Sequence, residues 1–234
     1  MNPPERAAEP RRAQLAGPLR DRAEAGRFLA DELGRLELHD PIVLGIPRGG
    51  VPVGYEIARR LRAPLDVLVV RKIGAPGDPE YGLGAVAEGN LVLLDEPRAR
   101  AAGFSRAALE PVIRQELEEV TDRLTRFREG RPPPELAHRS VVVVDDGVAT
   151  GGTVEAGIAV VRARGPAAVV VALGVAPAGA VGRLRAAADA VVVLLTPSRF
   201  EAVGEWYRRF DPVDDREVAR LLAEARAFPR ARAA

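Results

Sequence analysis

The sequence contains no cysteine, and this absence excludes several kinds of chemistry. Disulfide bonds, thiolate zinc sites and cysteine nucleophiles all require the missing residue. Serine occurs only at Ser105, Ser140 and Ser198, and histidine only at His39 and His138. No serine stands in a G-x-S-x-G turn, so the sequence disfavours a serine hydrolase and a histidine-rich metal site. Because disulfides are absent, we expect a cytoplasmic protein.

Long apolar runs are missing as well. Segments such as Val141–Val144 and Ala190–Leu195 have the length of a β-strand, whereas a membrane helix needs about 20 apolar residues. The first residues, MNPPERAAEPRRAQ, lack the apolar stretch of a secretory signal. We therefore expect no membrane partner, a flexible tail over residues 1–18 and one domain over residues 19–234.

Lysine is nearly missing, because Lys72 is the only lysine among the 34 basic residues. A single lysine in an arginine-rich chain indicates a position that prefers a compact ammonium group, although chance survival explains it equally well. The 33 acidic residues leave a net charge of only +1. This balance disfavours nucleic acid as a partner.

What the sequence does contain is an alternation of apolar strands and helices. Near-continuous apolar runs are typical of parallel strands that are buried on both faces. We therefore predict the α/β class, with an open, mainly parallel sheet and helices on both faces. Strands are predicted over 41–46, 65–70, 84–87, 91–94, 140–144, 168–175 and 190–195. Helices are predicted over 21–36, 51–61, 105–128, 153–164, 178–188 and 214–228.

Three loops follow strands of this predicted sheet, at 47–50, 71–83 and 145–152. Ligands of open parallel sheets bind beyond the carboxyl ends of the strands, where these loops lie. The segment 71–83 is rich in glycine and proline and shows no apolar period, so it is expected to be a loop.

The strongest chemical signal is the segment VVVVDDGVATGGT, residues 141–153. Its small loop residues let backbone N–H groups close around an anion, and the following helix N-terminus favours a phosphate. Asp145 and Asp146 suit the hydroxyls of a vicinal diol, so the pair and the loop together describe a ribose 5-phosphate site. The spacing fits neither a Walker A loop nor a dinucleotide turn. A plain strand–turn–helix with no ligand is the alternative.

This segment resembles the phosphoribosyl-pyrophosphate-binding motif of the type I phosphoribosyltransferases. The resemblance implies that the 5-phosphate loop consists of Ala149, Thr150, Gly151, Gly152 and Thr153. It implies a pyrophosphate loop at Pro47, Arg48, Gly49 and Gly50.

The likeness extends over roughly residues 20–210 and is greatest to a bacterial branch described only as predicted phosphoribosyltransferases. The runs shared with that branch are GIPRGGVPV, VRKIGAPG-PE, DDGVATG and AVG--Y--F. The branch has no settled acceptor. The type I fold carries a small hood, which is expected here over residues 196–216.

The resemblance implies a magnesium-dependent enzyme that transfers ribose 5-phosphate from phosphoribosyl pyrophosphate to a nitrogen acceptor, in particular a nucleobase. The resemblance implies that Arg71 and Lys72 begin a flexible catalytic loop and that Asp145 and Asp146 orient the ribose. The Mg²⁺ ion would have no direct protein ligand and would reach the two aspartates through water. A non-catalytic module of the same fold that senses the donor or a nucleotide is the alternative, and a homodimer is expected.

The acceptor is expected near an aromatic group after the last strand. Phe200, Trp206 and Tyr207 could stack on a flat base, although packing of the hood onto the sheet explains them equally well. Ala149 stands where the hypoxanthine-guanine enzymes carry an aspartate, and alanine cannot perform acid–base chemistry. This departure disfavours a 6-oxopurine acceptor and leaves adenine and non-base acceptors open.

Overall fold

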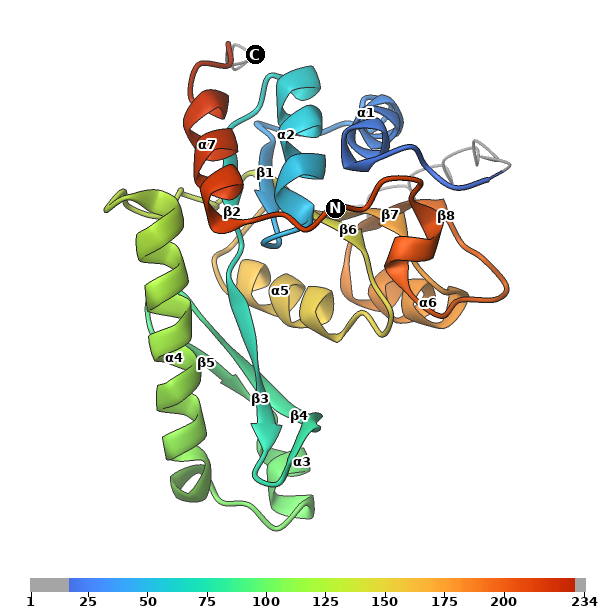
Figure 1. Cartoon of the computed structure of the whole chain (residues 1–234). Coiled ribbons are helices and arrows are strands. Elements are labelled where there is room, and N and C mark those ends of the chain that lie inside the picture. Colours follow the sequence, from blue (N-terminus) through green and yellow to red (C-terminus); the bar gives the residue numbers. More distant parts are fainter. Residues whose placement is uncertain (1–16, 230–234) are drawn as a thin grey trace, which may run out of the picture.

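The computed structural model describes residues 17–229 and has a five-stranded parallel sheet at its centre (Figure 1). The strand order is β2-β1-β6-β7-β8. These strands are β1 (Ile42–Gly45), β2 (Leu65–Val67), β6 (Ser140–Gly147), β7 (Ala168–Val175) and β8 (Ala190–Leu195). The predicted open parallel sheet is thereby confirmed, whereas the predicted tail lies almost wholly outside the described residues.

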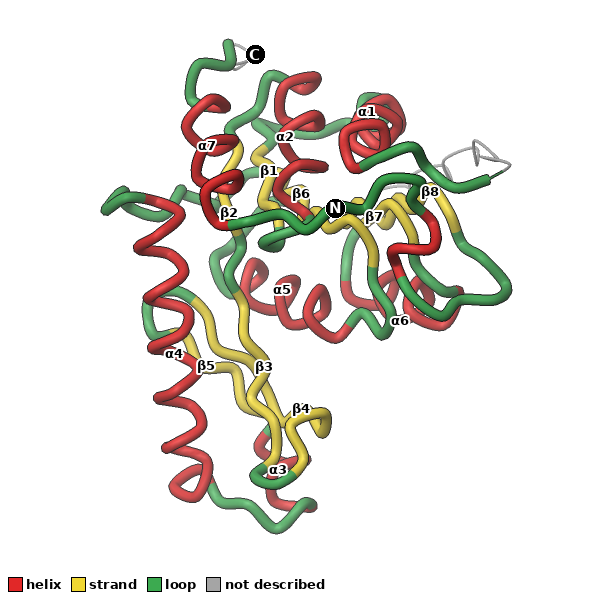
Figure 2. The backbone as a smooth tube through the Cα atoms, viewed as in Figure 1, coloured by secondary structure: helices red, strands yellow, loops and turns green. Residues whose placement is uncertain are grey.

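Helices cover both faces of this sheet, as Figure 2 shows. One face carries α1 (Arg22–Leu33) and α2 (Gly50–Leu61), and the other carries α5 (Gly152–Arg162) and α6 (Ala178–Ala187). A further helix, α7 (Asp215–Ala225), packs on the outer side of α2. The strand residues Val141–Val144 are fully buried, because both layers of helices exclude water from them. Within residues 17–229, none of the helices is long and apolar enough to cross a membrane.

A second, antiparallel sheet projects from this body together with a long helix (Figure 1). We call this unit the β-arm. It comprises β3 (Val70–Ala75), β4 (Asp78–Ala87), β5 (Leu91–Leu94), α3 (Glu96–Ala101) and α4 (Arg106–Arg128). The predicted strand 65–70 is in fact divided between the two sheets, and α3 was not predicted.

The β-arm corrects the prediction that residues 71–83 form a flexible loop. They pair instead as a β3–β4 hairpin. The apolar alternation of a strand is hidden in the sequence because small residues occupy many of its positions. Gly84 shows why glycine is needed there, since a Cβ atom would lie 2.2 Å from the carbonyl oxygen of Leu93.

The two faces of the β-arm pack on different helices. Ile73 and Leu83 belong to the core that contains residues of α4, whereas Val70 and Ala85 belong to the core that contains Ile158 of α5. Successive side chains of a strand point to opposite faces. The side chains of neighbouring β3 residues therefore face opposite sides of the β-arm.

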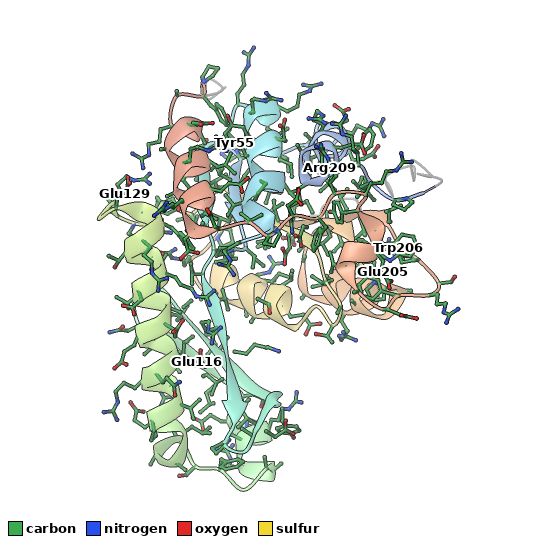
Figure 3. All side chains as sticks on the ribbon, viewed as in Figure 1. Tyr55, Glu116, Glu129, Glu205, Trp206 and Arg209 are labelled. Atoms are coloured by element: carbon green, nitrogen blue, oxygen red, sulfur yellow. The ribbon has the colours of Figure 1, made fainter. Side chains whose placement is uncertain are left out.

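The predicted hood segment, residues 196–216, runs beside the start of the described chain. It contains the 3₁₀ helix η1 (Val203–Trp206). The Leu19 N–H donates to the Trp206 carbonyl at 2.9 Å, and the Arg208 N–H donates to the Leu19 carbonyl at 2.8 Å. Arg209, labelled in Figure 3, lies beside α1. Residues near both ends of the described chain thus form this layer. That residues 196–216 make up a separate hood stays a prediction.

Asp21 is the N-cap of α1, and its contribution to stability should depend on pH. Burial alone would raise its pKa, but the Glu24 N–H, Arg209 and Arg20 bring the pKa of Asp21 down to about 2. A lowered pKa stabilises the fold above the unfolded value near 4, and the stabilisation is lost as pH falls from about 4 to about 2. Asp21→Ala should therefore cost about 1 kcal/mol at pH 7 and less at pH 3.

Urea unfolding of both proteins at the two pH values measures this difference. Asp31→Ala is the matched control, because Asp31 lies on the same helix and its side chain is 59% exposed. A cost of Asp21→Ala that is the same at pH 7 and pH 3 would contradict the assignment.

Candidate functional site

Two loops that the sequence singled out separately meet at the carboxyl edge of the parallel sheet. Loop 47–50 follows β1, and the segment 145–153 comprises the end of β6, which extends to Gly147, and the turn into α5; β1 and β6 are neighbours in the sheet. A Cβ atom on Gly49 would lie 2.0 Å from the Asp146 Oδ2 atom, and one on Gly50 would lie 2.3 Å from the Val144 carbonyl oxygen. The glycines are therefore required by the close approach of the two loops.

The acidic pair lies near the end of β6, beside Gly49 and Gly50 of loop 47–50 and before the turn into α5. Asp146 is buried and Asp145 is partly buried. The Nε atom of Arg22 donates to Asp146 Oδ2 at 2.7 Å. Burial and the neighbouring Asp146 carboxylate raise the pKa of Asp145 well above its ordinary value. Burial also raises the pKa of Asp146, and Arg22 opposes this rise.

The predicted phosphate loop leads directly into α5. Gly151 is the N-cap of the helix and has φ +80, a left-handed conformation that favours glycine. The N–H groups of the first helical turn lack carbonyl partners inside the helix, so they form an anion-binding end. Arg183 of α6 holds the loop from outside, with Nε 2.9 Å from Glu155 Oε1 and a hydrogen bond to the Thr150 carbonyl.

The structure brings only one of the two predicted catalytic cations to this loop. Lys72 lies beside Gly152, since a Cβ atom on Gly152 would be 3.8 Å from Lys72 Cδ. Arg71 points to the opposite face of β3, where its Nε donates to Glu116 of α4 at 2.6 Å. Glu116 is labelled in Figure 3. A cleft of about 740 Å³ between the β-arm and α5 is lined by Lys72, Thr150 and Gly152, among others.

The comparison with protein families agrees with this convergence of loops. The family model described as "Phosphoribosyl transferase domain" matches residues 19–207. The chain belongs to the phosphoribosyl transferase domain family.

Relatives of this phosphoribosyl transferase domain are found among curated proteins and solved structures. Two Mycobacterium tuberculosis proteins, named "Putative phosphoribosyl transferase MT0597" and "Putative phosphoribosyl transferase Rv0571c", are each 46% identical over 205 residues. The match covers 88% of this chain and 46% of each relative, so the chain spans about half their length. The crystal structure of TT1426 from Thermus thermophilus is 46% identical, with a TM-score of 0.82 over 88% of this chain and 98% of that one.

Arg48, in the predicted pyrophosphate loop of this phosphoribosyl transferase domain, is held by another element. Its Nη1 atom lies 3.6 Å from Asp215 Oδ1, at the start of α7, and its side chain is 56% exposed. The peptide bond between Pro47 and Arg48 is cis. An exposed ion pair of this length is weak, so an anionic ligand at loop 47–50 can compete with Asp215 for the guanidinium.

The aromatic residues of the phosphoribosyl transferase domain form a packed cluster. Tyr207 is buried, and its hydroxyl donates to the Asp146 carbonyl at 2.6 Å. Phe200 and Trp206 are partly buried against the same cluster. These contacts favour the packing alternative, above all for Tyr207, and the role of the three residues at an acceptor stays a prediction.

Arg22 and Arg183 are the site residues that sequence reasoning missed. Each is one arginine among many, on a helix far along the chain from its partner. No local pattern marks either one, because each is identified only by the tertiary contact that it makes.

The acids of the site also bear on the predicted Mg²⁺ ion. Within residues 17–229, no group of three or more histidine, aspartate or glutamate residues could hold a metal. Asp145 and Asp146 are two adjacent carboxylates, and Arg22 already occupies one oxygen of Asp146. This donor set fits a Mg²⁺ ion that a substrate carries in and that the aspartates contact through water.

Proposed function

We propose that this chain is a phosphoribosyltransferase that moves ribose 5-phosphate from phosphoribosyl pyrophosphate to a nitrogen acceptor. One observation carries the proposal: the acidic pair lies between two glycine loops at the carboxyl ends of β1 and β6. Such a site offers anion-binding backbone on both sides of a diol-binding centre. That arrangement suits a sugar with a phosphate at one end and a pyrophosphate at the other.

In the proposed reaction, the bond between C1 of the ribose and the pyrophosphate oxygen breaks, and the oxygen keeps the electron pair. A C1–N bond forms to the acceptor, which loses a proton to solvent. Positive charge develops on the ring, as in glycoside chemistry, and the carboxylates of Asp145 and Asp146 would stabilise it while they orient the hydroxyls. Loop 47–50 would bind the leaving pyrophosphate through its backbone and Arg48.

Mg²⁺ is the proposed cofactor. When bound, it would neutralise charge on the pyrophosphate, and Asp145 and Asp146 would hold its water ligands. The acceptor class stays a proposal, with a nucleobase as the first candidate, and Ala149 removes one means of proton transfer to a 6-oxopurine.

Lys72 is expected to bind the 5-phosphate. The Cδ atom of Lys72 lies beside Gly152, which supports a role of its ammonium group in binding the sugar phosphate at the phosphate loop. Lys72→Ala should weaken binding of ribose 5-phosphate and of phosphoribosyl pyrophosphate by similar factors, about 10-fold each, which corresponds to one charge-assisted contact.

Calorimetric titration with both ligands measures the Lys72 effect. Arg71→Ala is the matched control, because Arg71 is the next residue of the same strand and contacts Glu116 on the other face. An equal loss of affinity in Arg71→Ala would contradict the placement, and so would a loss for phosphoribosyl pyrophosphate alone.

A pyrophosphate-release screen tests the proposed function directly. The chain is incubated with phosphoribosyl pyrophosphate, Mg²⁺ and a panel of nucleobases and other nitrogen nucleophiles. Release that depends on one acceptor and disappears in the Asp145→Asn, Asp146→Asn double variant supports the proposal. The absence of donor binding in the unaltered chain would reject it.

The sensing module is the second candidate, and one observation favours it. Arg71, which the resemblance implies to be catalytic, is held against α4 by Glu116 and away from the loops. Tight binding of the donor without turnover of any acceptor would support sensing over catalysis.

A further inference from the structure

We propose that Arg22 is a positioning residue that fixes the Asp146 carboxylate for the hydroxyls of a bound sugar phosphate. This inference rests on the proposed function. It adds to that function a residue from the first helix of the domain, which none of the predicted loops contains.

The contacts of Arg22 are those of a fixed side chain. Its Nε donates to Asp146 Oδ2 at 2.7 Å, and its Nη1 donates to the Asp211 carbonyl at 2.7 Å. The guanidinium carbon lies 3.9 Å from the centre of the Phe210 ring. The two side chains of the ion pair are only 13% and 11% exposed, so water screens their attraction little.

Asp146 is held through its backbone as well. The Tyr207 hydroxyl donates to the Asp146 carbonyl at 2.6 Å, and the Tyr207 ring stacks on Phe210 at 5.1 Å. Tyr207, Phe210 and Arg22 thus form one connected support around a single acid. Asp145 lacks such support: within residues 17–229 its carboxylate accepts a hydrogen bond from the Asp146 N–H and from no side chain of another element.

Two properties of this support matter for ligand binding. Adjacent buried carboxylates repel each other, and the Arg22 guanidinium supplies a compensating positive charge at the pair. Arg22 engages Oδ2, while a carboxylate has further lone pairs on its other oxygen for a ligand hydroxyl. A fixed carboxylate loses little conformational entropy when the ligand binds, which strengthens binding.

The proposal predicts that loss of Arg22 weakens binding of the sugar phosphate and leaves binding of inorganic phosphate unchanged. Calorimetry compares ribose 5-phosphate with inorganic phosphate, which needs only the phosphate loop. Arg22→Gln should weaken binding of ribose 5-phosphate about 10-fold and leave the affinity for inorganic phosphate unchanged. Arg22→Lys, which keeps the charge, should restore part of the loss.

The matched control is Arg27→Gln, because Arg27 lies on the same helix and forms a looser ion pair with Glu56, at 3.7 Å. It should bind both ligands like the unaltered chain. The melting temperature of each variant is recorded, and if Arg22→Gln does not fold, Arg22→Lys must still show weaker selection of ribose 5-phosphate over phosphate.

Different results overturn different claims. Unchanged affinity of Arg22→Gln for ribose 5-phosphate, or an equal loss for both ligands, overturns the positioning role and leaves the proposed function intact. If the unaltered chain binds neither ribose 5-phosphate nor phosphoribosyl pyrophosphate, the proposed function fails and the role of Arg22 fails with it.

Discussion

Replacing Asp145 and Asp146 together with asparagine is expected to abolish binding of phosphoribosyl pyrophosphate. Each carboxylate would accept charge-assisted hydrogen bonds from the ribose, worth about 1.5 kcal/mol or more apiece. Losing both should raise the dissociation constant at least about 100-fold. Calorimetric titration of the donor into the double variant measures this loss.

The double variant should remain folded. Asparagine keeps the size of the side chain, and burial already raises the pKa of both acids, so the fold gains little from their charges. Glu118→Gln with Asp122→Asn is the matched control, because it removes two exposed carboxylates of α4 that lie outside the site. Since Arg22 loses its partner in the double variant, Asp145→Asn alone provides a second measurement. Unchanged donor affinity in a folded double variant would show that the two acids are not part of the site.

Replacing Gly49 with alanine is expected to damage the same site by a purely steric route. Gly49 has φ −63, which any residue adopts, so the backbone itself accepts alanine. The new Cβ atom would lie 2.0 Å from Asp146 Oδ2, so the carboxylate must leave its position and its bond to Arg22. We expect a loss of about 1–3 kcal/mol in unfolding free energy and at least about 10-fold weaker donor binding.

Gly182→Ala is the control for this substitution. Gly182 lies in α6, and a Cβ atom there would meet nothing within 4 Å. Alanine in an open helical position stabilises the helix by up to about 1 kcal/mol, so this variant should be at least as stable as the unaltered chain. Donor affinity in Gly49→Ala equal to that of Gly182→Ala would show that the Gly49–Asp146 contact is not part of the site.

The body of the fold and the two glycine loops could be predicted because their signals are local. Buried parallel strands leave apolar runs such as Val141–Val144, and a helix N-terminus leaves the run of small residues before Val154. The order of these elements then determines which loops follow strands at the carboxyl edge. That the two loops belong to neighbouring strands is shown by the structure.

The remainder could not be predicted because it depends on contacts between distant segments. The hairpin of β3 and β4 is built largely from glycine and small residues, which leave no alternation to detect. The separation of Arg71 from Lys72 follows from the face of β3 that each residue occupies. The partnership of Arg22 with Asp146 joins residues 124 positions apart.

Asp146 is held by Arg22 near one end of the domain and by Tyr207 near the other. Arg22 precedes β6 in the chain, but the other supports of Asp146 and Arg22 come from residues 207–211, which follow it. During synthesis, all five strands of the parallel sheet are made before the residues that complete the proposed sugar site. If the proposed function holds, a nascent chain would gain donor binding only after Tyr207 and Phe210 have docked against Asp146 and Arg22.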